Sequence, residues 1–438
     1  MSLDVHGSHD GEHGGAPARP AEGAAAAFAP LRGHTPAPRR APVHAAVARA
    51  LLRRLAADLD ARIVLPDGQA LGATRPSAPV MLIEDARLFD RVGVDHKLGV
   101  GEGYLAGEWR PGPGTDLADL LTPFAERLTE IVPAPLRRFR RLVEARHPIH
   151  EDNDRDGAAS NISQHYDLSN ELFRTFLDET LSYSAAWFDQ DTGTAGFAGL
   201  AAAQRRKVDG ILDLARVGPG TRLLEIGTGW GQLAIQAAGR GAQVDTITLS
   251  REQQALAISR IAAAGCADRA RVHLCDYRDV ARIGAAYDAV VSVEMIEAVG
   301  ERYWPEFFAA VAAALRPGGW FGLQAITMAH DRMLDSRHAY GWVHKYVFPG
   351  GLIPSRVAIA DQARRAGLRE RAARSLGPDY AHTLRLWRER FREQAEQVRE
   401  LGFDEQFQRV WEYYLAYSEA GFRSAHLDVW QIGLEHTG

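Results

Sequence analysis

Cysteine is the residue that this sequence most nearly lacks. Only Cys266 and Cys275 occur among its 438 residues. Two cysteines cannot build a disulfide framework or a four-cysteine zinc site. We therefore expect a protein of a reducing compartment, the cytoplasm, with no bound metal.

Long apolar runs and an excess of charge of one sign are missing as well. No window reaches the ~18 unbroken apolar residues of a transmembrane helix, and the first residues lack the basic start and apolar run of a secretory signal. Lys and Arg number 51 against 56 Asp and Glu, a formal net charge of −5. A dedicated nucleic-acid binder would carry a basic excess, so we expect no nucleic-acid partner and only peripheral membrane contact.

The residues that are present predict a globular chain, 46% hydrophobic, with two or three domains at ~150 residues each. Residues 1–42 are rich in Ala, Gly, Pro and His without an apolar period, which predicts a disordered tail. Residues 43–132 predict a small α+β domain with a hairpin at Asp67-Gly68. Within it, GEGYLAGEW (101–109) is either a turn with two aromatic anchors or a small site.

Residues 133–160 predict a basic helix followed by a linker. Five arginines between positions 137 and 146 surround Leu136, Phe139 and Leu142. A basic helix with an apolar stripe can lie on an anionic membrane surface. A solvated connecting helix is the alternative.

Short apolar strands alternate with helices from residue 205 onward, which predicts an α/β domain with a doubly wound, mainly parallel sheet. The last third reads as helical and aromatic. Within the α/β pattern, LLEIGTGWG is an apolar strand followed by a glycine-rich turn. Its G-x-G-x-G spacing does not meet the dinucleotide fingerprint. Glu225 would repel a pyrophosphate at this turn and favour a cationic ligand, such as a sulfonium cofactor.

Seven segments, LLEIGTGWG among them, follow one another in a recognisable order: NISQHYDLSNELFRTFLDETLSYSAAWF, LLEIGTGWG, TLSREQQ, DYRD, VSVEMIEAVG, KYVFPGGLIPS and DYAHTLRLW. In these motifs the chain resembles, over residues 45–435, the cyclopropane-fatty-acyl-phospholipid synthases and mycolic-acid methyltransferases. The resemblance implies a class I methyltransferase domain over residues 161–438 that uses S-adenosylmethionine.

The resemblance also implies which residues hold S-adenosylmethionine. The three loop glycines with the YS element would surround it, TLSREQQ would hold its ribose and methionine parts, and the tyrosine of DYRD would lie against its adenine. Together with the acid of the glycine loop, the expected cofactor-binding residues are Tyr183, Ser184, Glu225, Gly227, Gly229, Gly231, Thr248, Gln253 and Tyr277.

In the family, a glutamate, a tyrosine and a backbone group hold a bicarbonate ion that acts as base. The matching groups here are Glu297, expected at the end of a strand, Tyr380 and the backbone of Ile326. Two further family ligands differ, because Ala185 replaces a cysteine and Gln324 replaces a histidine. We therefore expect bicarbonate to bind less strongly than in the family.

LQAIT and VEMIEAVGE look more like the branch that makes 10-methylene fatty acids on the route to tuberculostearate. The sequence thus predicts a C-methyltransferase that acts on the cis double bond of unsaturated phospholipid acyl chains through a carbocation and leaves a methylene branch. The alternatives are a cyclopropane-forming enzyme, a methyltransferase of small soluble substrates and a non-catalytic lipid-binding protein. A separate reductase would be needed to saturate the branch, because the chain has no flavin or nicotinamide fingerprint. Whether the chain forms a homo-oligomer is open.

Overall fold

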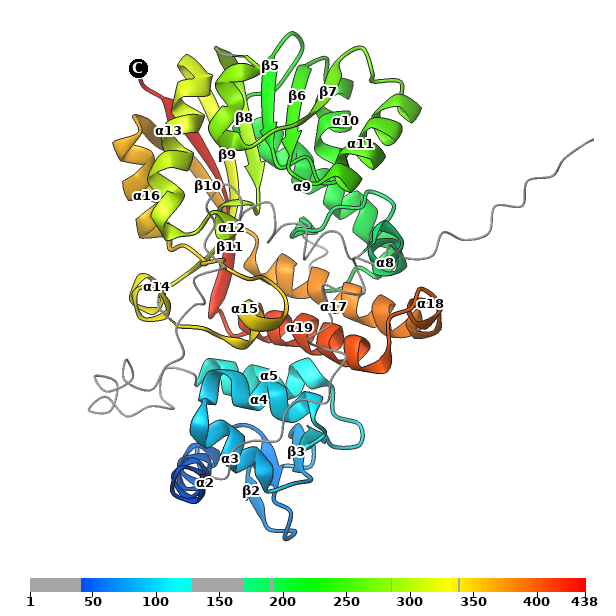
Figure 1. Ribbon diagram of the computed structural model, residues 1–438, viewed down its shortest axis with the longest axis vertical. Helices are drawn as coiled ribbons and strands as arrows, with labels where there is room; N and C mark the ends of the chain where they lie inside the picture. The colour runs from blue at the N-terminus through cyan, green and yellow to red at the C-terminus, as the bar shows by residue number, and fades with distance from the viewer. Residues whose placement is uncertain (1–40, 128–168, 190–192, 285, 338) are drawn as a thin grey trace, which may run out of the picture.

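The computed structural model describes residues 41–127, 169–189, 193–284, 286–337 and 339–438. It contains a small N-terminal unit, a larger sheet domain and a pair of long helices between them (Figure 1). The predicted tail lies almost wholly outside the described residues, and the predicted basic helix and linker lie entirely outside them. In the described part of the chain, no helix is both long and apolar enough to cross a membrane.

The N-terminal unit is an α+β fold, as predicted. Its four-stranded sheet has the order β2-β1-β3-β4 and is made of β1 (Arg62–Val64), β2 (Ala70–Gly72), β3 (Val80–Ile83) and β4 (Trp109–Pro111). The predicted hairpin is present, since β1 and β2 are antiparallel and Gly68 turns between them with φ +84°. The helices are α2 (Pro42–Ala56), α3 (Arg87–Val94), α4 (His96–Leu105) and α5 (Leu117–Glu126).

The segment GEGYLAGEW (101–109) holds the end of α4, a turn at residues 106–107 and the start of β4, and its two aromatic residues, Tyr104 and Trp109, are buried as the anchor interpretation expects. Helix α4 begins at an Asp95 cap, whose carboxylate accepts from the backbone N–H groups of Lys97 and Leu98, and it runs on to Leu105. The glycines at 99, 101 and 103 of α4 let other groups approach this helix closely. A Cβ at Gly101, for example, would lie 2.4 Å from the Trp342 ring.

The larger domain is built on a seven-stranded sheet with the order β10-β11-β9-β8-β5-β6-β7. The strands from β5 to β9 run parallel, and β11 is antiparallel to both β9 and β10. Their bounds are β5 (Arg222–Ile226), β6 (Gln243–Thr248), β7 (Ala270–Leu274), β8 (Tyr287–Val293), β9 (Leu315–Met328), β10 (Leu368–Ser375) and β11 (Leu427–His436). The predicted fold class, a mainly parallel α/β sheet with a small N-terminal α+β domain, is confirmed.

Helices cover both faces of this sheet because its central strands are apolar on both sides. Leu223 of β5 packs in one core cluster with α9 and α10, whereas the next residue, Leu224, packs in another with α13. The helices of this domain are α8 (Asn170–Phe176), α9 (Leu200–Leu214), α10 (Gln232–Gly239), α11 (Arg251–Ala263), α12 (Ile296–Val299), α13 (Trp304–Ala314), α14 (His330–Ser336), α15 (Trp342–Tyr346) and α16 (Arg356–Arg365), with short 3-10 turns at Phe197–Gly199, Tyr277–Arg282 and Glu301–Tyr303.

The last third of the chain is only partly the helical region that the sequence predicts. It contains the aromatic helices α17 (Gly377–Glu393), α18 (Ala395–Glu400) and α19 (Glu405–Arg423). It also contains β10 and β11, which the sequence analysis missed. Strand β10 lies at the sheet edge with most of its residues exposed, so it lacks the alternation of apolar and polar residues that marks a strand.

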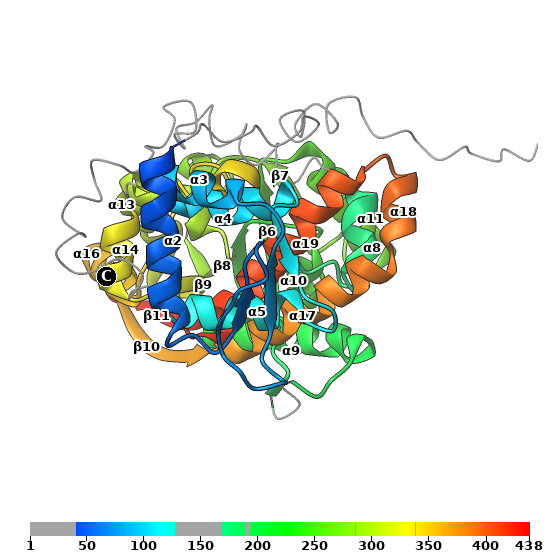
Figure 2. The same ribbon diagram turned by 90° about the horizontal axis from the view of Figure 1, so that it is seen from below.

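The pair α17 and α19 joins the two units. Helix α19 contacts α4 and α5 of the N-terminal unit, and α17 contacts α8 and β11 of the sheet domain. The view from below in Figure 2 shows the N-terminal unit, with α2, in front of the sheet domain. Arg388 of α17, 1% exposed, pairs with Asp116 at the start of α5 (2.8 Å) and with Glu419 of α19 (3.0 Å).

Helix α15 makes a second link between the units. Glu102 of α4 accepts from Lys345 Nζ (2.6 Å) and from the Tyr346 hydroxyl (3.1 Å). Its other oxygen accepts from Arg91, which also pairs with Glu108. The chain that follows α15 reaches α12, where the N–H of Leu352 donates to the Glu297 carbonyl. The N-terminal unit thus supports a segment that contacts the region of the predicted catalytic glutamate.

Candidate active site

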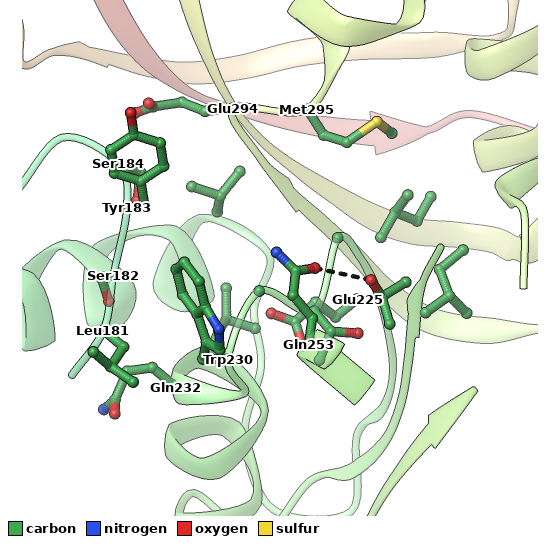
Figure 3. A pocket seen from close by; sticks show the side chains of 18 of the residues that line it. Leu181, Ser182, Tyr183, Ser184, Glu225, Trp230, Gln232, Gln253, Glu294 and Met295 are labelled. Carbon is green, nitrogen blue, oxygen red and sulfur yellow. Dashed lines mark hydrogen bonds between the residues drawn. The ribbon is translucent and has the colours of Figure 1, made fainter. Parts of the chain in front are cut away.

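A pocket lies at the carboxyl ends of β5, β6 and β8, where open α/β sheets bind their ligands. Eight of the nine predicted cofactor-binding residues line it (Figure 3). These are Tyr183, Ser184, Glu225, Gly227, Gly229, Thr248, Gln253 and Tyr277. The arrangement of the sheet therefore brings together residues spread over almost a hundred positions of the sequence.

Gly231 is the one predicted residue that does not line the pocket. It precedes α10 with φ +88°, a conformation that favours glycine. A Cβ at this position would lie 3.2 Å from the Cβ of Ala257, so Gly231 allows α10 to pack closely against α11. Gly227 and Gly229 also have positive φ, at +99° and +51°, but they turn the backbone along the pocket wall.

Glu225 gives the pocket a buried acid. Its side chain is 3% exposed, and among the described residues its Oε2 has no hydrogen-bond partner. Burial raises the pKa of Glu225 to about 8, although a hydrogen bond to Thr246 and the charge of Lys207 act in the opposite direction. A buried carboxyl oxygen without a partner costs free energy until a donor or a cation reaches it.

S-adenosylmethionine fits these residues. Its sulfonium and ammonium groups are cationic, which matches the unpartnered oxygen of Glu225. Thr248 donates to Gln253 (2.9 Å), so these two polar side chains form one unit on the wall (dashed line in Figure 3). Tyr277 supplies an aromatic ring on the same pocket.

The YS element connects the pocket to an aromatic cluster. Tyr183 lines the pocket, packs 5.2 Å from the ring of Trp387 and donates to the hydroxyl of Tyr414 (3.0 Å). Its neighbour Ser184 accepts from Lys207 Nζ at 2.6 Å. Lys207 is 2% exposed, and burial lowers its pKa to about 8. One side of the pocket therefore combines aromatic rings with a buried amine.

The carboxylate at the end of β8 is Glu294, not Glu297. Glu294 follows the last strand residue directly, lines the pocket beside Met295 (Figure 3) and has φ +50°, a strained conformation for a residue other than glycine. Its Oε1 accepts from the Ala185 N–H (2.9 Å) and Gln324 Nε2 (2.7 Å), and its Oε2 accepts from the Tyr380 hydroxyl (2.7 Å).

Glu297 lies instead in the short helix α12, so its predicted place at a strand end is wrong. Its Oε1 accepts from the N–H of Ile326 at 2.5 Å, and its Oε2 has no partner among the described residues. Burial, with a further contribution from the nearby Glu294, raises the pKa of Glu297 to about 8. The catalytic role expected for Glu297 stays a prediction.

Bicarbonate does not fit this arrangement. The groups at four of the family's ligand positions already donate to carboxylates of the chain. Ala185, Gln324 and Tyr380 donate to Glu294, and Ile326 donates to Glu297. An anion placed here would meet the Glu294 carboxylate and no remaining donor among these four groups.

Sequence reasoning missed Glu294 and Lys207. Glu294 carries a readable signal, since it ends the apolar run AVVSV and ligands bind at the carboxyl ends of such strands. Lys207 carries no such signal in the sequence. A lysine in a helix ordinarily lies in solvent, and only the packing of α9 buries the side chain of Lys207.

The comparison with solved structures agrees with this fold. The crystal structure of the mycolic acid cyclopropane synthase CmaA1 complexed with SAH and CTAB matches with a TM-score of 0.56 and 29% identity, over 63% of this chain and 98% of that one. The cyclopropane synthase MmaA2 from Mycobacterium tuberculosis matches equally well, with the same TM-score and coverage. The fold and the pocket define the class, an S-adenosylmethionine-dependent methyltransferase.

The sequence comparisons identify the family of methyltransferases to which the chain belongs. The model of the mycolic acid cyclopropane synthetase family matches residues 153–432. Tuberculostearic acid methyltransferase UfaA1 of Mycobacterium tuberculosis is 52% identical over 399 residues, which cover 90% of this chain and 92% of that protein. Cyclopropane-fatty-acyl-phospholipid synthase of Escherichia coli K12 is 32% identical over 366 residues, 82% and 89% of the two chains. The chain therefore belongs to the mycolic acid cyclopropane synthetase family.

Proposed function

We propose that this protein transfers a methyl group from S-adenosylmethionine to the cis double bond of an unsaturated phospholipid acyl chain and leaves a methylene branch. The relative that is 52% identical, named a tuberculostearic acid methyltransferase, supports this product over a cyclopropane. The structural observation that carries the proposal is one pocket that joins an acid, Glu225, whose Oε2 has no hydrogen-bond partner among the described residues, to an aromatic wall at Tyr183.

The two halves of the pocket suit the two reactants. The donor supplies an electrophilic methyl group on its sulfonium. Glu225 and the polar pair of Thr248 and Gln253 orient the donor, while the rings next to Tyr183 give an acyl chain an apolar surface. An isolated alkene is a weak nucleophile, so holding it in line with the methyl group in a water-poor site supplies much of the rate.

The chain's own groups then handle the charge that develops on the acyl chain. The π electrons of the alkene form the new C–C bond, and the neighbouring carbon becomes a cation. Aromatic faces and a carboxylate stabilise such a cation in a site of low dielectric constant. Tyr183 provides an aromatic face and Glu294 provides a carboxylate, and both line the same pocket.

The position of the base decides the product. A hydride shift from the methyl-bearing carbon moves the cation next to the new methyl group, and loss of a methyl proton leaves an exocyclic C=C bond. Loss of a methyl proton before the shift closes a cyclopropane instead. The replacements at Ala185 and Gln324 change the groups around the base, which supports a product different from a cyclopropane.

The test is a product analysis. The purified protein is incubated with vesicles of oleoyl phospholipid and methyl-labelled S-adenosylmethionine, and the released fatty acids are identified by mass spectrometry. We expect a labelled methylene-branched acid and one S-adenosylhomocysteine per label. A cyclopropane as the sole product would refute the proposed product. Turnover with small soluble acceptors alone, or no turnover at all, would refute the proposed function.

The proposal extends to the setting of the reaction. Substrate chains lie in a membrane, so we infer that the protein works peripherally at a membrane surface, with the arginine-rich segment at 137–146 as a contact. The domain limits expected at residues 43–132 and 161–438 belong to the same proposal. A separate reductase would saturate the branch afterwards.

A further inference from the structure

Glu294 is held as a bound anion would be held. Three donors from three separate parts of the chain converge on its carboxylate: the backbone N–H of Ala185, the amide of Gln324 on β9 and the hydroxyl of Tyr380 on α17. All three positions are ones at which the resemblance places ligands of a bicarbonate base.

We propose that the Glu294 carboxylate takes the place of bicarbonate and is the resident base of the reaction, which therefore needs no bicarbonate. The inference rests on the function proposed above and adds the identity of the group that removes the proton.

The surroundings fix which atoms face Glu294. Gln431 of β11 donates to Gln324 Oε1 (2.9 Å) and to the carbonyl of Lys207 (2.9 Å). With its oxygen occupied, Gln324 presents its NH₂ group to Glu294. The backbone N–H of Ala185 is a donor only. Burial raises the pKa of the Tyr380 hydroxyl well above its ordinary value, so this group also stays a donor.

One oxygen of Glu294 is left able to take a proton. Oε1 accepts two hydrogen bonds, whereas Oε2 accepts one among the described residues. Burial raises the pKa of Glu294, against the effect of its three donors and of Lys207, and makes it a stronger base than an exposed glutamate. The titratable groups that face it are Lys207 of α9, Glu297 of α12, Tyr380 of α17 and Tyr414 of α19.

The proton transfer balances without a further reactant. Oε2 takes a proton from the new methyl group, and the electron pair of that C–H bond becomes the second bond of the methylene. The cation next to it is neutralised, and Glu294 is left as a neutral acid. The proton returns to solvent after the products leave, so no oxidant or reductant is consumed.

The backbone at Glu294 supports a functional reading. A glutamate at φ +50° is strained, and such strain persists only where the surrounding structure holds it, most often at functional sites. Here the same residue donates its own N–H to the Gln324 carbonyl (2.8 Å), so the strained turn aims the side chain back at the side chain of Gln324.

Two variants and one control test the proposal. Glu294→Gln keeps the shape but cannot take a proton, and we expect turnover to fall about 100-fold or more while the affinity for S-adenosylhomocysteine stays within about threefold. Glu294→Gly removes the carboxylate, relieves the backbone and leaves three donors around a space for a small anion. Formate or bicarbonate added to Glu294→Gly should restore turnover in a saturable manner. Glu389→Gln, on the exposed side of α17, should behave as the wild type.

The wild-type protein supplies the decisive comparison. Its rate on oleoyl phospholipid should be the same in buffer freed of carbon dioxide and in buffer with added bicarbonate. A rate that rises several-fold with bicarbonate, or full activity in Glu294→Gln, would overturn the inference while leaving the proposed function intact. A wild-type protein that releases no S-adenosylhomocysteine with any unsaturated lipid would overturn both.

Discussion

At the scale of single residues, the pocket depends on acids that are buried before any ligand binds. Oε2 of Glu225 has no hydrogen-bond partner in the part of the chain that the structure describes, and the nearby charge of Lys207 acts to lower the pKa of this acid. Because the pKa of Glu225 lies at about 8, this carboxyl is mostly protonated in the free protein at pH 7. A cation placed beside it stabilises the ionised form and lowers that pKa.

This predicts that binding of S-adenosylmethionine releases up to one proton per site at pH 7. Affinity should rise with pH and level off above about 8, where Glu225 is already ionised in the free protein. Titration calorimetry in two buffers of different ionisation enthalpy, without lipid, measures the release.

The control for this experiment is Glu225→Gln, which should bind more weakly and lose the release due to Glu225. It is needed because burial lowers the pKa of Lys207 to about 8 as well, so a proton could also come from the amine. Equal proton release from the wild type and from Glu225→Gln would contradict the assignment to Glu225.

At the scale of secondary-structure elements, the sequence predicted best where local pattern and final burial agree. The strand of LLEIGTGWG, its loop and α10 are apolar and glycine-rich where the fold needs them to be, so the α/β fold and the acid Glu225 followed from the pattern. The other positions that line the cofactor pocket followed from the family resemblance. Strand β10 was missed because it is an exposed edge, and its pairing with β11 comes from a segment over fifty residues away.

The glutamate expected to be catalytic was harder to predict, because its place also depends on contacts between distant segments. Glu294 and Glu297 are three residues apart, and the choice between them depends on where β8 ends. The donors that distinguish them come from Ala185, Gln324 and Tyr380, which only the folded chain brings together. Burial of Lys207 likewise depends on tertiary packing and leaves no trace in the local sequence.

The close contact between α4 and α15 leads to a prediction at the same scale. In Gly101→Ala the new Cβ would lie 2.4 Å from the Trp342 ring, so α4 and α15 must move apart. We expect a loss of about 1–3 kcal/mol in the free energy of unfolding, the usual cost of overpacking. We also expect slower turnover, because the segment after α15 contacts α12.

Thermal unfolding and the rate of S-adenosylhomocysteine release measure the two effects. Gly239→Ala is the matched control, since its Cβ would meet open space on the exposed end of α10 and should cost nothing. Unchanged stability and turnover in Gly101→Ala would show that α15 does not need this close contact.

At the scale of the whole molecule, one buried ion-pair network connects the N-terminal unit to the sheet domain. Arg388 lies between Asp116 and Glu419 with 1% exposure, so its removal leaves two acids without their main partner. Breaking a buried pair from one side costs about 3–5 kcal/mol, far more than the loss of a surface pair.

Arg388→Met should therefore lower the free energy of unfolding by about 3 kcal/mol and divide urea unfolding into separate transitions for the two units. Arg399→Met, on the exposed face of α18, should change stability by less than about 0.5 kcal/mol. Fluorescence and circular dichroism followed over the same urea range test both. A single unshifted transition in Arg388→Met would mean that the joining of the units does not depend on this network.

The position of β11 has a consequence for how the chain becomes active during its synthesis. This strand is the last described element along the chain, yet it lies between β9 and β10 inside the sheet. Gln431, which fixes the amide of Gln324, arrives with it. Residues 222–293, which form β5, β6 and β8, are synthesised well before β11, but the support of Glu294 is complete only when residues 427–436 insert between β9 and β10. A chain cut short before β11 would therefore lack the group that fixes the amide of Gln324 against Glu294.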